Sequence, residues 1–313
     1  MLTARPSLLA ALTSAAAASA AFAGLSHTQV VAPGGFVQSL AGPSTPGAGP
    51  WPGSDLSTMY TAPGSDIQET LFAGDTTATR IASYSGGSTS NSASGTVGMG
   101  FMHLLADNDA PNSSFFAEAN ANGGWKDSFL ITAPGQNGQT GYMQFTLNVT
   151  GFLSAAGFAG AASFTTTAYK DTTQLLANAL FSPGNSDPLS SDRQYGHWSV
   201  SSAPNNSKNV SGVITMAVPF TYGTPFNLGI YANAEAGMRS SSGVSGNSQA
   251  SVQFQNSLYW GGISGMYLGG TTNTISDYQI VSGSGIDWRG AIPSPATAML
   301  LAAHALVAAR RRR

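Results

Sequence analysis

The chain has 313 residues, of which 42% are hydrophobic and only 8% are charged. This apolar content can form a substantial core and argues against a wholly disordered chain, and the low charge argues against an ordinary cytosolic helical protein. Seven basic and all fourteen acidic residues lie between residues 24 and 292. Because binding to phosphates needs clustered lysine and arginine, this composition disfavours nucleic-acid binding. The chain has no cysteine, which excludes disulfides, thiolate metal sites and thiol nucleophiles.

The first 23 residues are typical of a secretory signal peptide. Arg5 supplies a positive charge, residues 8–22 form an apolar, alanine-rich stretch, and Ala21 and Ala23 form an A-x-A cleavage site. The alternative is an N-terminal membrane anchor, but such anchors need about 20 apolar residues and usually lack a small-residue cleavage site. The pattern therefore predicts export, with cleavage after Ala23.

Residues 24–64 are rich in glycine and proline, and we interpret them as an irregular segment. From residue 65 to 290, short segments rich in Val, Ile, Phe, Tyr and Thr alternate with turn-forming residues. In residues 251–260, for example, Val252 and Phe254 alternate with glutamines, as in a half-buried strand. The predicted strands are residues 67–72, 80–84, 95–105, 114–119, 128–131, 140–149, 161–169, 197–201, 210–218, 226–234, 250–260 and 278–282.

These segments predict an all-β fold. Only residues 172–180 have the character of a helical turn or short helix. Many short strands without alternating helices are typical of two packed antiparallel sheets. We therefore expect one domain over residues 65–290, an antiparallel β-sandwich or jelly roll.

Asp107, Asp109 and Asn112 are candidate calcium ligands. They belong to the segment Asp-Asn-Asp-Ala-Pro-Asn, which we place in a turn between two strands. Calcium takes roughly six to eight oxygen ligands from such loops. The EF-hand pattern is not met, and Asp and Asn also occur in turns simply because they favour turn conformations. Calcium is the one cofactor that the sequence suggests.

No catalytic site is evident. Glu69, Glu118 and Glu235 would form a glycosidase site only if two carboxylates converged, and isolated glutamates in strands usually face solvent. A serine triad would need His103 or His197, and neither is accompanied by a G-x-S-x-G motif. We therefore predict that the protein is not an enzyme.

Trp198 and Tyr195 are candidate glycan-binding residues. Sugar rings stack on exposed faces of tryptophan and tyrosine. Trp198 follows the polar loop 182–193, so of the tryptophans it lies nearest to a loop. Burial in the core is nevertheless the commoner fate of tryptophan in a folded domain.

The last residues, 291–313, have three parts in order. Pro293, Ser294 and Pro295 come first, an apolar run over residues 296–309 follows, and the chain ends with Arg310, Arg311, Arg312 and Arg313. A helix formed by the apolar run would rise about 21 Å, which is less than the hydrocarbon core of roughly 30 Å. The arginines favour the cytoplasmic side of a membrane. The pattern predicts a weak and temporary anchor.

This tail resembles the PEP-CTERM sorting signal of exported bacterial proteins, in which a Pro-x-Pro motif, a short apolar helix and a basic cluster are read by an exosortase-type transpeptidase. Ser294 stands here in place of the family's usual central glutamate. Residues 250–262 and 278–288 are also similar to the C-terminal half of many PEP-CTERM proteins. The resemblance implies a surface β-sandwich, an exosortase-type partner and transient anchoring in the bacterial membrane. The alternative is a simple weak tail anchor whose prolines end the folded domain.

Three functions are compatible with the sequence. The features present favour an exported, non-enzymatic protein of the cell surface or extracellular matrix. The second is a glycan-binding module for exopolysaccharide, suggested by the aromatic residues and by the family resemblance, with other surface proteins as further candidate partners. The third is a secreted glycoside hydrolase with two carboxylates in one cleft.

Overall fold

The computed structural model describes residues 33–44, 66–73, 77–86, 89–113, 116–157, 160–171, 173–175, 197–201, 206–238, 246–271 and 273–292. Most of these residues are in strands, the others are in turns, bends and connecting segments, and none of them is in a helix. This confirms the predicted all-β fold for the described part of the chain. The expected signal peptide and the motifs of the sorting tail lie outside it.

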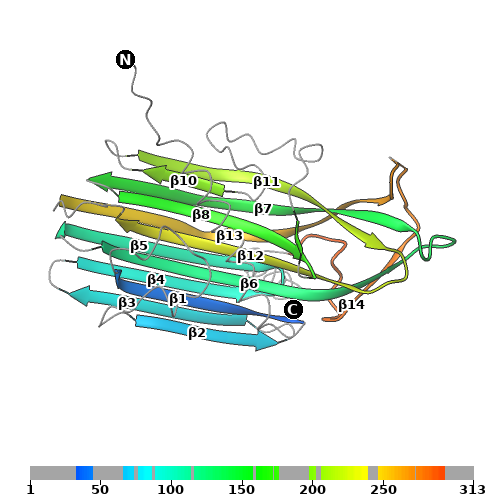
Figure 1. Ribbon diagram of the computed structural model, residues 1–313, viewed down its shortest axis with the longest axis horizontal. Helices are drawn as coiled ribbons and strands as arrows, with labels where there is room; N and C mark the ends of the chain where they lie inside the picture. Colours follow the sequence, from blue (N-terminus) through cyan, green and yellow to red (C-terminus); the bar gives the residue numbers. More distant parts are fainter. Residues whose placement is uncertain are drawn as a thin grey trace, which may run out of the picture.

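Two antiparallel sheets make up the fold (Figure 1). The eight-stranded sheet has the order β10-β8-β12-β6-β1-β2, with β9 beside β8 and β14 beside β6. Its strands are β1 (Gly34–Ser44), β2 (Asp66–Ala73), β6 (Phe116–Thr132), β8 (Gly160–Lys170), β9 (Thr173–Leu175), β10 (His197–Ser201), β12 (Phe226–Met238) and β14 (Gln279–Ser282).

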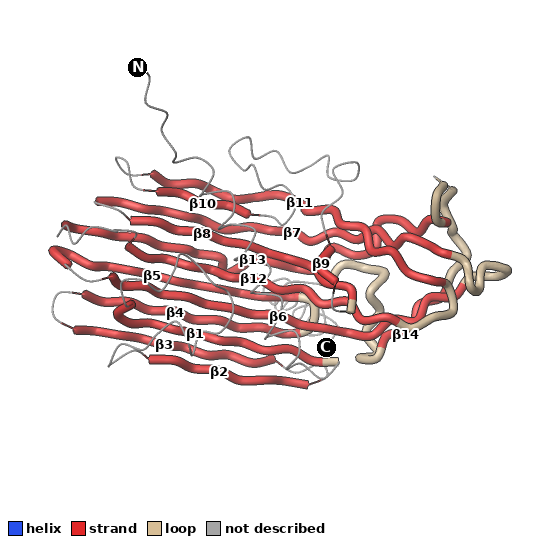
Figure 2. The backbone as a smooth tube through the Cα atoms, viewed as in Figure 1, coloured by secondary structure: helices blue, strands red, loops and turns tan. Residues whose placement is uncertain are grey.

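The six-stranded sheet has the order β11-β7-β13-β5-β4-β3. Its strands are β3 (Thr77–Gly86), β4 (Thr89–Gly98), β5 (Phe101–Ser113), β7 (Thr140–Gly157), β11 (Asn206–Thr221) and β13 (Gly246–Leu268). Figure 2 shows that β6, β7 and their neighbours continue beyond the other strands into a narrower end with the longer loops.

One apolar core holds the two sheets face to face. Phe164 of β8 stacks on Phe254 of β13 with ring centroids 3.7 Å apart, and Trp125 of β6 contacts Trp260 of β13 at 5.9 Å. Phe254 is buried whereas Gln253, the residue before it in β13, is exposed, which confirms the predicted alternation. The described part of the chain is therefore β-sandwich-like.

The expectation of an irregular segment over residues 24–64 is wrong for Gly34–Ser44, which forms β1. This strand pairs with both β2 and β6, and its Val37 is fully buried. Glycine and proline obscure its period-2 pattern. Pro43 is tolerated because it lies beyond the pairing with β2, where β1 has a single neighbouring strand.

Glycine also explains the wrong boundaries of three predicted strands. The predicted strand 95–105 is a hairpin of β4 and β5, because Gly100 with φ +82° allows a tight turn. The predicted strands 114–119 and 128–131 are instead one strand, β6. Its Gly123 lies within the strand and not in a turn. A Cβ at this position would lie 2.4 Å from Val97 Cγ2 of the facing sheet. This glycine allows the two sheets to approach closely.

The predicted short helix over residues 172–180 is wrong for Thr173–Leu175, which forms β9 beside β8. Asp171, which follows β8, has φ +52°, a conformation of turns and not of helices. Its carboxylate accepts a hydrogen bond from the backbone N–H of Asn227 at 2.9 Å. The chain therefore reverses at Asp171, and pairing with β8 decides the conformation of the next residues.

Residues 283–292, which we call the closing segment, cover one end of the core. Trp288 in this segment is fully buried. Its indole N–H donates to Asp127 Oδ2 of β6 at 2.7 Å, and its carbonyl accepts from the indole N–H of Trp260 in β13 at 2.7 Å. Ile292 N–H donates to the carbonyl of Trp260 at 3.0 Å. The closing segment therefore joins the two sheets.

Candidate functional site

The outer faces of the two sheets differ in exposure. On the eight-stranded sheet, Tyr231 and Glu235 point away from the core but are only 2% and 3% exposed. Burial, with a smaller effect of nearby Tyr169, raises the pKa of Tyr231.

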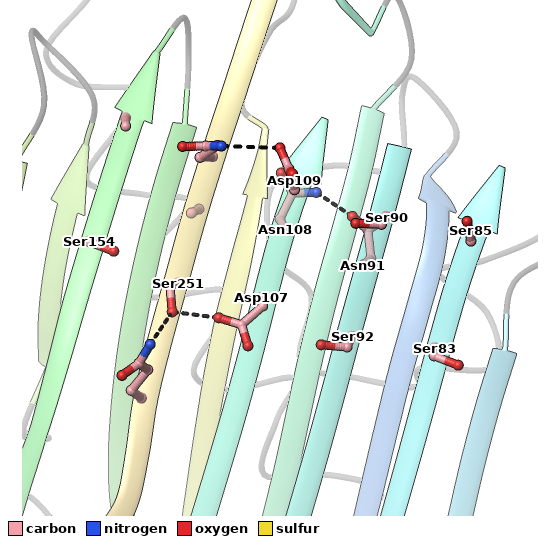
Figure 3. Close-up of a pocket in the computed structure, with 14 residues that line it drawn as sticks. Ser83, Ser85, Ser90, Asn91, Ser92, Asp107, Asn108, Asp109, Ser154 and Ser251 are labelled. Atoms are coloured by element: carbon pink, nitrogen blue, oxygen red, sulfur yellow. Dashed lines mark hydrogen bonds between the residues drawn. The ribbon is translucent and has the colours of Figure 1, made fainter. Parts of the chain in front are cut away.

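On the six-stranded sheet, a shallow hollow of about 620 Å³ lies across five strands of the outer face. We call this hollow the trough, and Figure 3 shows its lining.

Two rows of mostly polar side chains line the trough. Residues that lie directly opposite each other in neighbouring antiparallel strands share a face of the sheet. The register therefore aligns one row across β3, β4, β5, β13 and β7, namely Ser83, Ser92, Asp107, Ser251 and Ser154. The second row, across the same strands, is Ser85, Ser90, Asp109, Gln249 and Ala156. With strands about 4.8 Å apart, each row is about 19 Å long.

Hydrogen bonds orient the two carboxylates of the trough. Ser251 Oγ donates to Asp107 Oδ1 at 2.5 Å, and Gln249 Nε2 donates to Asp109 Oδ1 at 3.3 Å (Figure 3). Gln253 Nε2 in turn donates to Ser251 Oγ at 3.1 Å. A carboxylate can accept about four hydrogen bonds. Among the described residues, neither Oδ2 atom receives one, so both carboxylates can accept hydrogen bonds from a ligand.

The outer face of the six-stranded sheet carries little charge. In the described part of the sheet, Asp107 and Asp109 are the only acidic side chains on this face, and no lysine or arginine accompanies them. Arg80 and Lys208 belong to the edge strands β3 and β11. Their side chains lie on the opposite, core-facing side of the sheet. The register pairs Lys208 with the buried Leu153 and Arg80 with Gly95, which faces Val37 of the other sheet. The trough therefore presents hydroxyl, amide and carboxylate groups.

The candidate calcium ligands do not lie in a turn, as the sequence predicted, but in β5. Asp107 and Asp109 face outward, and Asn108 between them is buried and donates to Asn91 Oδ1 at 2.7 Å. The turn prediction is wrong because these residues continue the period-2 alternation of the strand. Asn112 lies further along the same strand. No group of three or more His, Asp or Glu side chains that could hold a metal occurs in the described ranges, and calcium binding stays a prediction.

Of the two candidate glycan-binding residues, only Trp198 belongs to the described part of the chain. Trp198 lies in β10, where the register pairs it with Phe164, and Tyr195 lies outside the described residues. Three other tryptophans occupy the core, namely Trp125, Trp260 and Trp288. The predicted signal cleavage site at Ala21 and Ala23 and the predicted sorting motif also lie outside the described residues.

The three glutamates lie in three strands of the eight-stranded sheet. Glu69 is in β2, Glu118 in β6 and Glu235 in β12. The register places Glu235 opposite Asn120, two residues along β6 from Glu118. None of the three belongs to the trough, which lies on the other sheet.

His103 lies on the same outer face as the trough, nearer the start of β5. Its Nε2 and the hydroxyl of Tyr259 form a hydrogen bond of 2.6 Å, and its ring contacts Phe101 with centroids 5.3 Å apart. Partial burial between these rings lowers the pKa of His103 from its ordinary value of 6.5. The imidazole is therefore neutral at pH 7, which keeps this face free of positive charge.

We expect His103 to make the fold less stable in mild acid. Its folded-state pKa is below 6.5, so the unfolded chain binds this proton more readily and the free energy of unfolding falls as pH drops from 7 toward 5. Replacing His103 with glutamine keeps a hydrogen-bonding group for Tyr259 but removes the titration. Urea unfolding at several pH values should give a smaller loss for the variant than for the wild type. Equal losses would contradict the prediction.

Sequence reasoning missed the trough. Its signal is a set of polar residues spaced by two, at Ser83 and Ser85, at Ser90 and Ser92, and at Asp107 and Asp109. That spacing shows which side chains share a face within a strand, but not which strands are neighbours. Ser251 and Asp107, which are hydrogen-bonded, are 144 positions apart in the chain.

The fold and the trough define a class of protein, an antiparallel β-sandwich-like fold with a shallow polar trough on one sheet. Comparison of the chain with protein-family models, with curated proteins and with solved structures found no match. The described ranges also contain no helix with the length and apolar character needed to cross a membrane. The functional argument therefore rests on the sequence signals and on the trough.

Proposed function

We propose that the protein is an exported, non-catalytic component of the bacterial cell surface or extracellular matrix. Residues 1–23 direct it through the secretory pathway, and the tail from Pro293 onward holds it temporarily in the membrane for an exosortase-type enzyme. The folded sandwich then acts as a binding module through the trough.

One observation carries the binding role. The trough is an exposed surface on which side chains from five strands form aligned polar rows. Its carboxylates accept hydrogen bonds from Ser251 and Gln249, which hold them on the floor of a broad and shallow hollow. Such a surface supports contact with a large partner better than catalysis, which needs an enclosed site that excludes water. The export signals support a partner outside the cell.

We expect the wild-type protein to be accessible at the cell surface and to lose its tail. Intact host cells are treated with protease and probed with an antibody against the sandwich, and the mass of the purified mature protein is measured. Replacing all four residues Arg310 to Arg313 with alanine should reduce tail removal and surface retention, because the basic cluster orients the anchor. The matched control is Arg289→Ala, which removes an exposed arginine of the folded domain and should leave processing unchanged.

Two results would contradict this proposal. One is a wild-type protein that resists protease in intact cells and is recovered from the cytoplasm with residues 1–23 still attached. The other is processing and retention that do not depend on the terminal arginines.

A further inference from the structure

We infer that the trough binds an uncharged polyhydroxylated polymer, a neutral polysaccharide, along the row that contains Asp107 and Ser251. This inference rests on the proposed function, because it names the ligand class of the same binding surface. It is carried by the chemistry of the lining, by the charge of the face and by the shape of the trough.

The lining provides the groups that recognise hydroxyls. Asp107 and Asp109 each have an oxygen, Oδ2, that accepts no hydrogen bond from the described residues. Hydrogen bonds from a hydroxyl to a carboxylate are short and about twice as strong as neutral ones. Ser92, on the strand beside Asp107, can both donate to and accept from a sugar hydroxyl. Ser251 donates its proton to Asp107 and can accept from a sugar hydroxyl. Neighbouring hydroxyls of one ring could therefore bind acceptors and donors of one row together.

The charge of the face selects against other polymers. Two carboxylates without a lysine or arginine on the described part of this face repel uronates, sulfates and phosphates. An extended peptide is also disfavoured. Peptides that bind to sheets do so through main-chain hydrogen bonds at an edge, whereas Asp107 and Ser251 lie on the paired interior strands β5 and β13.

The shape of the trough fits a segment of a long chain. The polar row crosses five strands over about 19 Å, and the hollow is shallow, whereas sites for small molecules enclose most of the ligand surface. The adjoining row adds apolar side chains at Ile81, Leu105 and Phe152. Ile81 is 65% exposed. The C–H face of a sugar ring can pack on such side chains while its hydroxyls contact the polar row.

The test uses the full chain, immobilised on an optical biosensor and exposed to soluble polymers. The neutral probes are dextran, galactomannan and hydroxyethylcellulose, and the anionic probe is polygalacturonate. We expect saturable binding of at least one neutral polymer and no binding of polygalacturonate. The double variant Asp107→Ala/Ser251→Ala should weaken the binding about tenfold or more, because a charge-assisted acceptor and its partner are lost.

The matched control is Thr150→Ala/Ser211→Ala. These two residues are also a cross-strand pair on the exposed outer face of the same sheet, but they lie outside the trough. The control should bind as the wild type does, and both variants should unfold at similar urea concentrations. No binding of any neutral polymer, equal weakening by the two double variants, or stronger binding of polygalacturonate would overturn the inference. Surface exposure of the protein would then still support the proposed function, whereas a cytoplasmic protein that binds a neutral polymer would overturn only the proposed function.

Discussion

Replacing Trp288 with alanine is expected to lower the free energy of unfolding by about 3–5 kcal/mol. The side chain is fully buried and stacks on Trp125 with ring centroids 4.7 Å apart. It also contacts Trp260 edge-on at 5.2 Å. The substitution leaves a large cavity where the closing segment joins the sheets, and it leaves Asp127 without one of its donors. Thermal unfolding should show a melting temperature lower by roughly 2–4 °C for each kcal/mol.

Two variants test the cause of this effect. Trp288→Phe keeps much of the aromatic packing but loses the hydrogen bond to Asp127, so its melting temperature should lie between those of the wild type and Trp288→Ala. Arg289→Ala changes the next residue, which forms an exposed ion pair with Asp287, and should leave the melting temperature nearly unchanged. A Trp288→Ala protein that unfolds at the wild-type temperature would show that the closing segment does not stabilise the core.

The variant Asp127→Asn, which keeps the shape of the side chain, is expected to lower the free energy of unfolding by about 3 kcal/mol. Asp127 is fully buried, and both of its oxygens accept hydrogen bonds. Oδ1 accepts from the backbone N–H groups of Ser128 at 2.8 Å and Ser284 at 3.0 Å. Oδ2 accepts from the Trp288 indole and from the Ser284 hydroxyl. An asparagine must place an NH2 group against one of these sets of donors, so a buried donor loses its acceptor.

Urea unfolding of the wild type and the variant measures this loss. The matched control is Asp171→Asn at an exposed turn, where one oxygen accepts both hydrogen bonds from Asn227. An asparagine oxygen can accept the same two bonds, and asparagine tolerates the positive φ of this position. The control should therefore change stability little. Equal effects of the two substitutions would mean that the carboxylate of Asp127 is not needed as a double acceptor.

The class of the fold could be predicted because it depends on local patterns. Alternation such as that of Val252, Gln253 and Phe254 is a property of neighbouring residues, and the structure confirms it. Glycine is harder to interpret, because it serves both turns and close packing. Gly100 makes a turn where the sequence pattern predicts a continuous strand. Gly123 lies inside one strand where the pattern predicts two.

The candidate site could be predicted only in part. Asp107 and Asp109 stand out in the sequence as acidic residues in a chain with few charges. The prediction that they lie in a turn is wrong, since both belong to β5 and face outward from it. Their partners Ser251 and Gln249 belong to β13. Nothing local identifies these two residues, because the chain is rich in polar residues with the same spacing.

The sequence by itself determined the low charge of the chain, the absence of cysteine and the β character of its central segments, and it holds the terminal patterns on which the proposals of export and sorting rest. These properties depend on composition and on short-range periodicity. Only the tertiary structure decided that β5 lies between β4 and β13 and that Asp127 meets Trp288 across 161 positions of the chain. Such contacts come from strand order, register and core packing, and these arise when distant segments bury their apolar faces against one another.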